Sequence, residues 1–346
     1  MTSEKKDTKA SDVVTELDGD QIRIQTNAVQ VFEAWREADR DFRHSYKGRM
    51  GWSSINGKTY LYRSTGRVNR SLGPRSPETE RIKEDYTAQR TRLRERRARL
   101  DKKLKELAPI NVAYRLGRVP KVAAKVLEAL DAAGLLGPHL LVVGTHSLYA
   151  YEAAAGVHFA GSLIATTDID FMWDVRKKLK LAILDVPSDG VMGVLRGVDK
   201  SFTKSKQQFS AVNDDGYAVD LIRPEEPDDL MTKLRGLGDS MDLEAAAIMG
   251  LQWLINAPRF ERIVVADNGR PLRMCCIDPR AYALYKLWMS KDALNREPEK
   301  RRRDRAQAFA TAELATQRLG LPFNAKDLAA LPLRLTQCAK DLWAKS

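Results

Sequence analysis

Two acids inside an apolar stretch, Asp168 and Asp170, constrain what this chain can fold into more than any other feature. Side chains alternate between the two faces of a strand, so both acids project from one face while Ile169 and Phe171 project from the other. Two carboxylates side by side on a core strand repel each other and are costly to desolvate. A divalent cation is the usual resolution, and oxygen-only ligands at this spacing suit Mg²⁺ or Mn²⁺.

An apolar run at Leu140–Val143 precedes the acids and stops at Gly144 and Thr145. We expect a strand, a glycine turn and then an alanine-rich helix from about 146 to 155. Backbone N–H groups at a turn that opens a helix are suited to cradle phosphates. A site with two acids normally takes a third carboxylate from a neighbouring strand, and the short apolar run around Asp220 offers one.

A Gly-Thr at a strand end, an Asp-x-Asp on the next strand and a lone Asp on a later strand resemble the nucleotidyltransferase fold of the DNA polymerase beta superfamily. The phrases GTHSLYAYEAAAG, ATTDIDFMWD and AVDLIRP are similar to a bacterial nucleotidyltransferase-like family, distantly akin to AbiEii-type toxins. The resemblance extends upstream to WSSINGKTYLYR and SLGPRSPETE and downstream to DPRAYALYKLW and KRRRDRAQA, so it covers most of residues 45 to 310. The chain departs from the superfamily at Thr145, where Ser or Gly is usual.

The resemblance implies a metal-dependent transfer of an NMP from an NTP to a hydroxyl acceptor, with release of pyrophosphate. Asp168 and Asp170 would bind both Mg²⁺ (or Mn²⁺) ions, and Asp220 would ligate the catalytic one. Gly144 and Thr145 would cradle the triphosphate. The implied fold class is α+β, with a nucleotidyltransferase core of mixed sheet and helices, a basic helical N-terminal extension and a mainly helical C-terminal domain.

Three cations downstream are further candidates for nucleotide binding. Lys286 lies in a mostly apolar helical stretch, where it is either a snorkelling surface lysine or a phosphate ligand, as its place in DPRAYALYKLW implies. Lys300 and Arg303 share one helix face with Asp304 and Gln307 by their spacing. That face is either a solvated charge run or the wall that completes the nucleotide pocket.

The N-terminal part of the chain is read from its periodicity and its turns. Residues 1–20 are polar without periodicity and are expected to be a disordered tail. Apolar residues at helical spacing predict an amphipathic helix over 22–46. Asn56-Gly57 between alternating residues predicts a β-hairpin, because both turn positions need a positive φ. A long helix is expected from about Pro77 to Leu107.

That long helix is the most basic stretch, with eleven Lys and Arg against four Asp and Glu in residues 81–105. One interpretation is a solvated helix laid on another helix. The other is an arm that tracks a nucleic-acid backbone, with Arg92, Arg96 and Arg99 as contacts. The aromatic, basic hairpin before it either stacks bases or docks on its own domain; its candidate residues are Trp52, Lys58, Tyr60, Tyr62 and Arg63.

Composition narrows the class of protein. A hydrophobic fraction of 43% allows a real core, and a formal charge of +12 favours an anionic partner such as nucleic acid or nucleotide phosphate. No apolar run approaches the roughly 20 residues of a membrane helix, so we expect no membrane partner. Three cysteines, at 275, 276 and 338, match neither a disulfide framework nor a metal-ligand spacing, which predicts a cytoplasmic protein.

We therefore expect a tail (1–20), an N-terminal extension with hairpin and basic helix (21–110), a catalytic core (111–225) and a mainly helical C-terminal domain (226–346). The expected partners are an NTP and an acceptor that the sequence leaves open between tRNA or other RNA, a protein and a small molecule. Two other functions compete with the enzyme. One is a catalytically silent nucleic-acid-binding protein, and the other is the toxin of a defence toxin–antitoxin pair.

Overall fold

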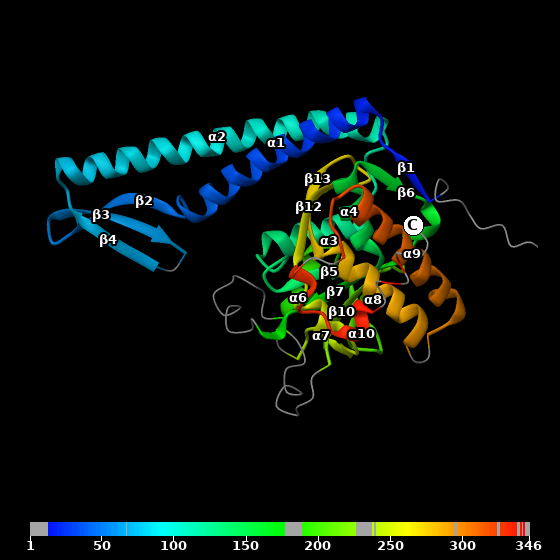
Figure 1. Cartoon of the computed structure of the whole chain (residues 1–346). Helices are drawn as coiled ribbons and strands as arrows, with labels where there is room; N and C mark the ends of the chain where they lie inside the picture. Colours follow the sequence, from blue (N-terminus) through cyan, green and yellow to red (C-terminus); the bar gives the residue numbers. More distant parts are fainter. Residues whose placement is uncertain are drawn as a thin grey trace, which may run out of the picture. The chain divides into compact units, whose positions relative to one another are not determined.

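The structure is a computed structural model that describes residues 13–66, 68–176, 189–225, 237–238, 240–293, 296–323 and 326–337, with residues 340 and 342. The chain divides into two compact units. Unit 1 comprises residues 1–22, 117–267 and 272–346, and unit 2 comprises residues 23–116 and 268–271. The elements of both are labelled in Figure 1.

Unit 1 is a mixed α+β structure, as the sequence predicted. Its strands are β1 (Val14–Glu16), β5 (Leu140–Val143), β6 (Val157–Phe159), β7 (Asp168–Trp173), β8 (Thr203–Lys204), β9 (Ser210–Val212), β10 (Ala218–Pro224), β11 (Ala246–Ile248), β12 (Arg259–Val265) and β13 (Pro271–Ile277). Its helices are α3 (Lys121–Ala132), α4 (Ser147–Ala155), α5 (Gly161–Ile164), α6 (Gly190–Val198), α7 (Leu251–Leu254), α8 (Pro279–Asp292), α9 (Pro298–Gln317) and α10 (Leu333–Thr336), with 3-10 turns η2 (Gly144–His146) and η5 (Lys326–Leu328).

An eight-stranded mixed sheet organises unit 1, in the order β12-β13-β5-β7-β10-β9-β8, with β11 paired to β10. The central strand β5 is buried along its whole length, which explains its uninterrupted apolar sequence. β5 pairs antiparallel with β7, and β7 pairs parallel with β10. These three strands place the candidate acids next to one another.

Helices cover the sheet and join it to the C-terminal part of the chain. α3 packs against α6, α4 packs against β12 and α9, and α8 packs along α9 (Figure 1). α8 is buried at ten consecutive positions from Pro279 to Trp288, so Lys286 is not a snorkelling surface lysine. Among the helices of the described ranges, none combines the length and the hydropathy needed to cross a bilayer.

Unit 2 consists of a helix pair and a small sheet. α1 (Gly19–His44) enters it from residue 23, and α2 (Pro77–Ala113) runs alongside α1 (Figure 1). Ion pairs join the two helices, from Arg96 to Glu37 at 2.8 Å and from Arg97 to Asp39 at 3.0 Å. The basic helix is therefore laid on another helix, which is the first of its two interpretations.

The sheet of unit 2 has the strand order β2 (Arg49–Ile55), β3 (Lys58–Thr65), β4 (Val68–Pro74). The predicted turn is confirmed, since Asn56 has φ 49° and Gly57 has φ 77° between β2 and β3. β4 was not expected, because Ser71, Gly73 and Pro74 near its end are typical of a loop. It pairs with β3 through a register irregularity at Leu61/Tyr62.

Two further expectations need correction. Residues 13–20 are not a disordered tail, since β1 pairs with β6 and α1 begins at Gly19; residues 1–12 lie outside the described residues. Residues 226–346 do not form a unit of their own, because β12 and β13 are strands of the core sheet and β13 pairs with β5. The helices α8 and α9 are the mainly helical part of this segment.

Candidate active site

Three carboxylates converge on one face of the sheet, from two neighbouring parallel strands. Asp168 and Asp170 lie two residues apart on β7, and Asp220 lies on β10 directly opposite Asp170. One carboxylate oxygen of each residue lies within 4.8 Å of the others. The sequence prediction that these three side chains meet is confirmed.

The turn after β5 closes against this cluster. Gly144 has φ +68°, and a Cβ atom at this position would lie 2.2 Å from the Oδ2 atom of Asp170. The position thus needs glycine for two reasons, its left-handed backbone and the close approach of a carboxylate. The phosphate-cradle candidate and the acidic cluster are parts of one site.

The cluster carries more negative charge than its surroundings neutralise. Burial, together with the neighbouring Asp168 and Asp220, raises the pKa of Asp170 to about 7. Burial also raises the pKa of Asp220, partly offset by a hydrogen bond from Ser210. The Oδ1 atom of Asp220 is buried without a hydrogen-bond partner among the described residues.

A divalent cation bound by these carboxylates would offset their repulsion and give the Oδ1 atom of Asp220 a partner. Three carboxylates within reach of one point suit Mg²⁺ or Mn²⁺. A bound cation favours the ionised form of every carboxylate that it contacts, so it would oppose both the burial and the repulsion that raise the pKa of Asp170. The donor set therefore fits a divalent metal.

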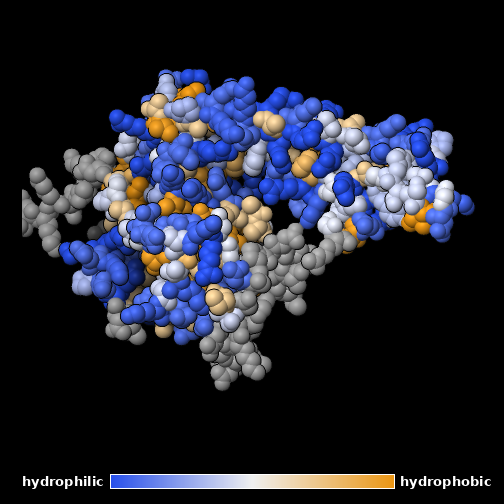
Figure 2. All heavy atoms as spheres, turned by 180° about the vertical axis from the view of Figure 1, so that it is seen from behind, coloured by the Kyte–Doolittle hydropathy of each residue, from blue (hydrophilic) through white to orange (hydrophobic). Residues whose placement is uncertain are grey.

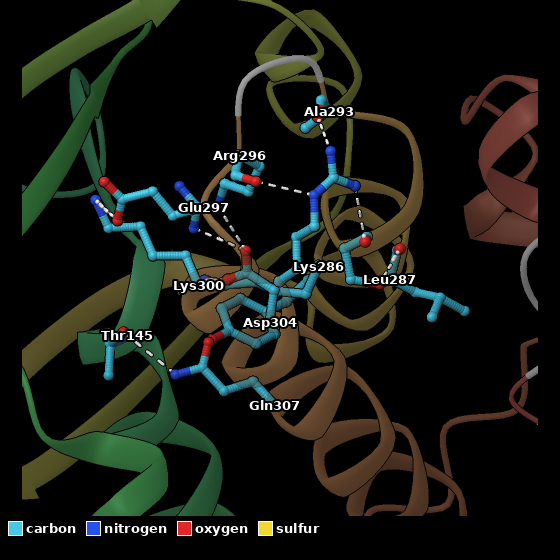
Figure 3. A network of polar contacts seen from close by, with 12 residues as sticks. Thr145, Lys286, Leu287, Ala293, Arg296, Glu297, Lys300, Asp304 and Gln307 are labelled. Carbon is cyan, nitrogen blue, oxygen red and sulfur yellow. Dashed lines mark hydrogen bonds and ion pairs between the residues drawn. The ribbon is translucent and has the colours of Figure 1, made fainter.

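A buried ionic network lies between α8 and α9 (Figure 3). The Nζ atom of Lys286 lies 2.7 Å from Oδ1 of Asp304, and Arg296 donates to Oδ2 of the same carboxylate at 2.8 Å. Asp304 is 0% exposed. The three residues leave one positive charge in excess, and both cations lower the pKa of Asp170.

Gln307, three residues after Asp304 on α9, joins this helix to the turn after β5 (Figure 3). Its Nε2 atom donates to the hydroxyl of Thr145 at 3.3 Å and to the carbonyl of Leu163 at 2.7 Å. Its Oε1 atom accepts from the hydroxyl of Tyr282 at 3.2 Å. Thr145 is itself buried, so α9 holds this turn in place from behind.

A family model described as Nucleotidyltransferase matches residues 121–332, more than half of the chain. The match contains all three converging acids, the turn at Gly144 and the ionic network on α8 and α9. The chain belongs to this nucleotidyltransferase family. No curated protein and no solved structure matches the chain itself.

The other predicted nucleotide ligands of the nucleotidyltransferase lie on α9. Lys300 has a side chain that is 50% exposed and that pairs with Glu297 at 3.3 Å. Arg303 donates to the carbonyl of Ala165 at 3.3 Å, and its Nε atom is buried without a partner among the described residues. An unsatisfied buried guanidinium donor is costly, so Arg303 is the stronger candidate of the two for binding an anion.

The three predicted nucleic-acid contacts of the nucleotidyltransferase lie on α2. Arg92 and Arg99 are exposed, whereas Arg96 is half-buried and engaged by Glu37. Arg90 and Arg97 lie over the ring of Phe42 on α1, at 5.3 and 4.8 Å from its centroid. Three of the eleven Lys and Arg of α2, namely Arg90, Arg96 and Arg97, therefore contact α1.

Sequence reasoning missed two neighbours of the acids, Tyr217 and Arg296, whereas His146 was identifiable because it follows Thr145 directly. The hydroxyl of Tyr217 lies 3.0 Å from Nε2 of His146, and this pair packs beside Asp168. Burial lowers the pKa of His146 to about 4, so its ring is neutral at pH 7. Arg296 was missed as well, because nothing in the sequence around it signals a partner on α9.

Proposed function

We propose that this nucleotidyltransferase transfers an NMP from an NTP to a hydroxyl acceptor and releases pyrophosphate. The observation that carries the proposal is the convergence of Asp168, Asp170 and Asp220 within 4.8 Å, at a glycine turn that opens a helix. The same arrangement supports placing the chain in the DNA polymerase beta superfamily. Its kinship to AbiEii-type toxins is part of this proposal.

Each acid has a distinct role in the proposed reaction. Asp168 and Asp170 would hold two Mg²⁺ ions, and Asp220 would ligate the one nearer the acceptor. When bound, the ions supply charge neutralisation of the phosphates and a lowered pKa of the acceptor hydroxyl. Asp220, whose pKa is raised by burial, would accept the hydroxyl proton as general base.

The bonds change in one displacement. The acceptor oxygen forms a bond to the α-phosphorus of the NTP while the bond from that phosphorus to the bridging oxygen breaks. Pyrophosphate leaves with the bonding electrons, and the acceptor proton passes to Asp220. The chain would contribute mainly position and charge, as is usual in transfer at phosphorus.

Positive charge for the triphosphate would come from the turn after β5 and from α8 and α9. Gly144 and Thr145 would offer backbone N–H groups, and Arg303 its unpartnered Nε atom. Lys286 would act from within its pair with Asp304, contributing through its field. Lys300 would reach the outer phosphates, because its exposed pairing with Glu297 is easily exchanged.

The test is transfer of label from each of the four α-labelled NTPs, with Mg²⁺ and cell extract. Products are then separated into RNA, protein and small molecules. We expect label in one fraction that depends on Mg²⁺, is absent with Asp170→Asn and persists with Asp215→Asn, a change at an exposed acid before β10. An unlabelled extract, together with RNA binding, would instead identify a catalytically silent binding protein. Growth arrest on expression that Asp170→Asn abolishes would identify a toxin.

A further inference from the structure

The sheet of unit 2 has two faces of different character. On one face, Leu61 is completely buried, and the ring of Trp52 lies under Lys83 and Arg75 at 5.6 and 5.4 Å. Arg63 lies on this same face over the ring of Tyr86, at 5.3 Å. Since Lys83 and Tyr86 belong to α2, this face is the one packed on the helix.

The opposite face presents Tyr60 and Tyr62. They alternate with Leu61 and Arg63 along β3, so they point away from α2. Both are partly exposed, and within the part of the chain that the structure describes neither has a side-chain hydrogen bond or a ring contact. The structure thus separates the predicted aromatic set, with Trp52 turned inward and the two tyrosines turned outward.

The cross-strand neighbours of these tyrosines have short side chains. Gly51 on β2 and Ser71 on β4 lie opposite Tyr62, and Ser53 on β2 and Pro74 on β4 lie opposite Tyr60. Small cross-strand neighbours leave the flat faces of both rings accessible. The backbone positions of Tyr60 and Tyr62 are about 6.6 Å apart along the strand, so both side chains stand in one row on this face. Aromatic side chains on one surface are the platform on which single-stranded nucleic acids stack successive bases.

The charge of this region selects a polyanion as the partner. Residues 42–77 contain eight Lys and Arg and no Asp or Glu. Residues 23–116 hold 23 Lys and Arg against 11 Asp and Glu, a net charge of +12 that equals the formal charge of the whole chain. On the outward face, Arg49 and Lys58 are exposed at the two ends of the tyrosine row.

An apolar protein partner fits this surface less well. Unit 2 is mostly blue and white in Figure 2, with only small orange spots on the visible face. The large exposed apolar side chains of its sheet, Ile55 and Val68, lie at strand ends and not between the tyrosines. Exposed serines beside the rings offer hydroxyls to the 2′-hydroxyls of RNA.

We propose that the outward face of the β2–β3–β4 sheet binds single-stranded RNA, with Tyr60 and Tyr62 stacking on successive bases and Arg49 and Lys58 contacting phosphates. RNA binding here is independent of catalysis. Its further role, presenting RNA as the acceptor of the NMP, rests on the proposed function. This assigns the docking of RNA to the sheet and leaves α2 as its support.

The test uses the full chain, a labelled 12-nucleotide single-stranded RNA and fluorescence anisotropy, without NTP or Mg²⁺. Tyr60→Ala and Tyr62→Ala should each weaken binding roughly 5- to 150-fold, while Tyr60→Phe and Tyr62→Phe should bind like wild type because a phenyl ring also stacks. Tyr114→Ala, at the end of α2, is the matched control and should change nothing. Circular dichroism of each variant checks that unit 2 is folded.

Salt dependence tests the phosphate contacts. Arg49→Gln and Lys58→Gln should each lower the slope of log affinity against log salt by about 0.7, the value for single strands. Folded tyrosine-to-alanine variants that bind like wild type would overturn the proposal. So would binding that is lost with Arg92→Gln and Arg99→Gln alone, because the helix would then be the docking surface. Equal affinity for a DNA oligonucleotide would overturn the choice of RNA.

Failure of this proposal and failure of the proposed function give different results. Asp170→Asn should bind RNA like wild type, because its carboxylate belongs to unit 1. If RNA binds through the tyrosines but nothing becomes labelled, the proposed NMP transfer is rejected and the proposed RNA-binding face is retained. If wild type and the tyrosine variants label a protein or metabolite equally, the proposed NMP transfer is retained and RNA is rejected as its acceptor.

Discussion

Asp170 lies directly opposite Asp220 in the parallel pairing of β7 with β10. Side chains at paired positions of neighbouring strands leave the sheet on the same side, about 4.8 Å apart. Asp168 adds a third acid to that side. The register of two strands therefore builds the acidic cluster, and a shift by one residue would turn Asp220 to the other face.

We expect Asp170→Asn to stabilise the metal-free protein at pH 8 but not at pH 4. The pKa of Asp170 in the folded protein, about 7, lies above its ordinary value of 3.8. Between these values the folded protein holds a proton that the unfolded chain has lost, so the free energy of unfolding falls as pH rises. The fall is on the order of 1.4 kcal/mol per pH unit, and asparagine does not share it.

Urea denaturation in EDTA at both pH values measures this difference, with Asp215→Asn as the control at an exposed acid. Saturating Mn²⁺ should reverse the order at pH 8, because a ligand that binds the folded state stabilises wild type more. An equal gain from Asp170→Asn at pH 4 and pH 8 would contradict the raised pKa.

A pair of glycine variants isolates the contact between the turn and the acids. Gly144 and Gly156 have nearly the same φ, +68° and +66°, but a Cβ at Gly156 meets nothing within 4 Å. Gly156→Ala should therefore cost only the backbone strain, roughly 1–2 kcal/mol. Gly144→Ala should carry that cost and also displace Asp170, weakening Mn²⁺ binding by about 10- to 100-fold. Calorimetric titration with Mn²⁺ compares the two, and equal affinities would show that Asp170 moves aside without loss.

A double-mutant cycle separates the structural role of Lys286 from its predicted role in nucleotide binding. Lys286→Met alone should lower the free energy of unfolding by roughly 3–5 kcal/mol, because it removes a partner from the fully buried Asp304. Lys286→Met with Asp304→Leu should be considerably more stable than the sum of the single changes. If the double variant recovers stability but keeps a raised KM for NTP, Lys286 also acts on the triphosphate. Additive losses would mean that the pair contributes no coupling.

Lys300 is a cleaner probe of triphosphate binding, since its pairing with Glu297 is exposed and contributes little to stability. We expect Lys300→Gln to raise KM for NTP several-fold with kcat nearly unchanged, as for a contact equally strong in the ground and transition states. Arg302→Gln removes an exposed charge two positions along α9 and serves as the control. Identical KM values for both variants would exclude Lys300 from the pocket.

The parts of the fold that depend on local rules were predictable from the sequence. The Asn56-Gly57 turn follows from two positive φ angles, and the strand that carries Asp168 and Asp170 follows from its period of two. Asp220 was identified because it is an acid inside a short apolar strand. Each of these signals lies within about ten residues of sequence.

The parts of the fold that depend on packing between distant segments could not be predicted from the sequence. Asp304 lies in a run of charged residues that reads as solvated, and its burial depends on α8 and on Arg296 across a break in the helices. β4 is polar because its sheet packs on α2 through one face only. Arg96 and Arg97 look like free cations in the sequence, yet they find Glu37 and Asp39 almost 60 residues away along the chain.

The placement of all the net charge in residues 23–116 also has a kinetic consequence. Outside that segment the numbers of acidic and basic residues are equal. The long-range electrostatic attraction of a polyanion therefore acts mainly on unit 2. Electrostatic steering would make RNA associate first with unit 2 and would raise the association rate. Salt screens this attraction beyond the Debye length, about 8 Å at physiological ionic strength. Raising the ionic strength should then lower the association rate constant far more than it raises the dissociation rate constant. Unit 2 would thus determine how fast the protein finds its RNA partner.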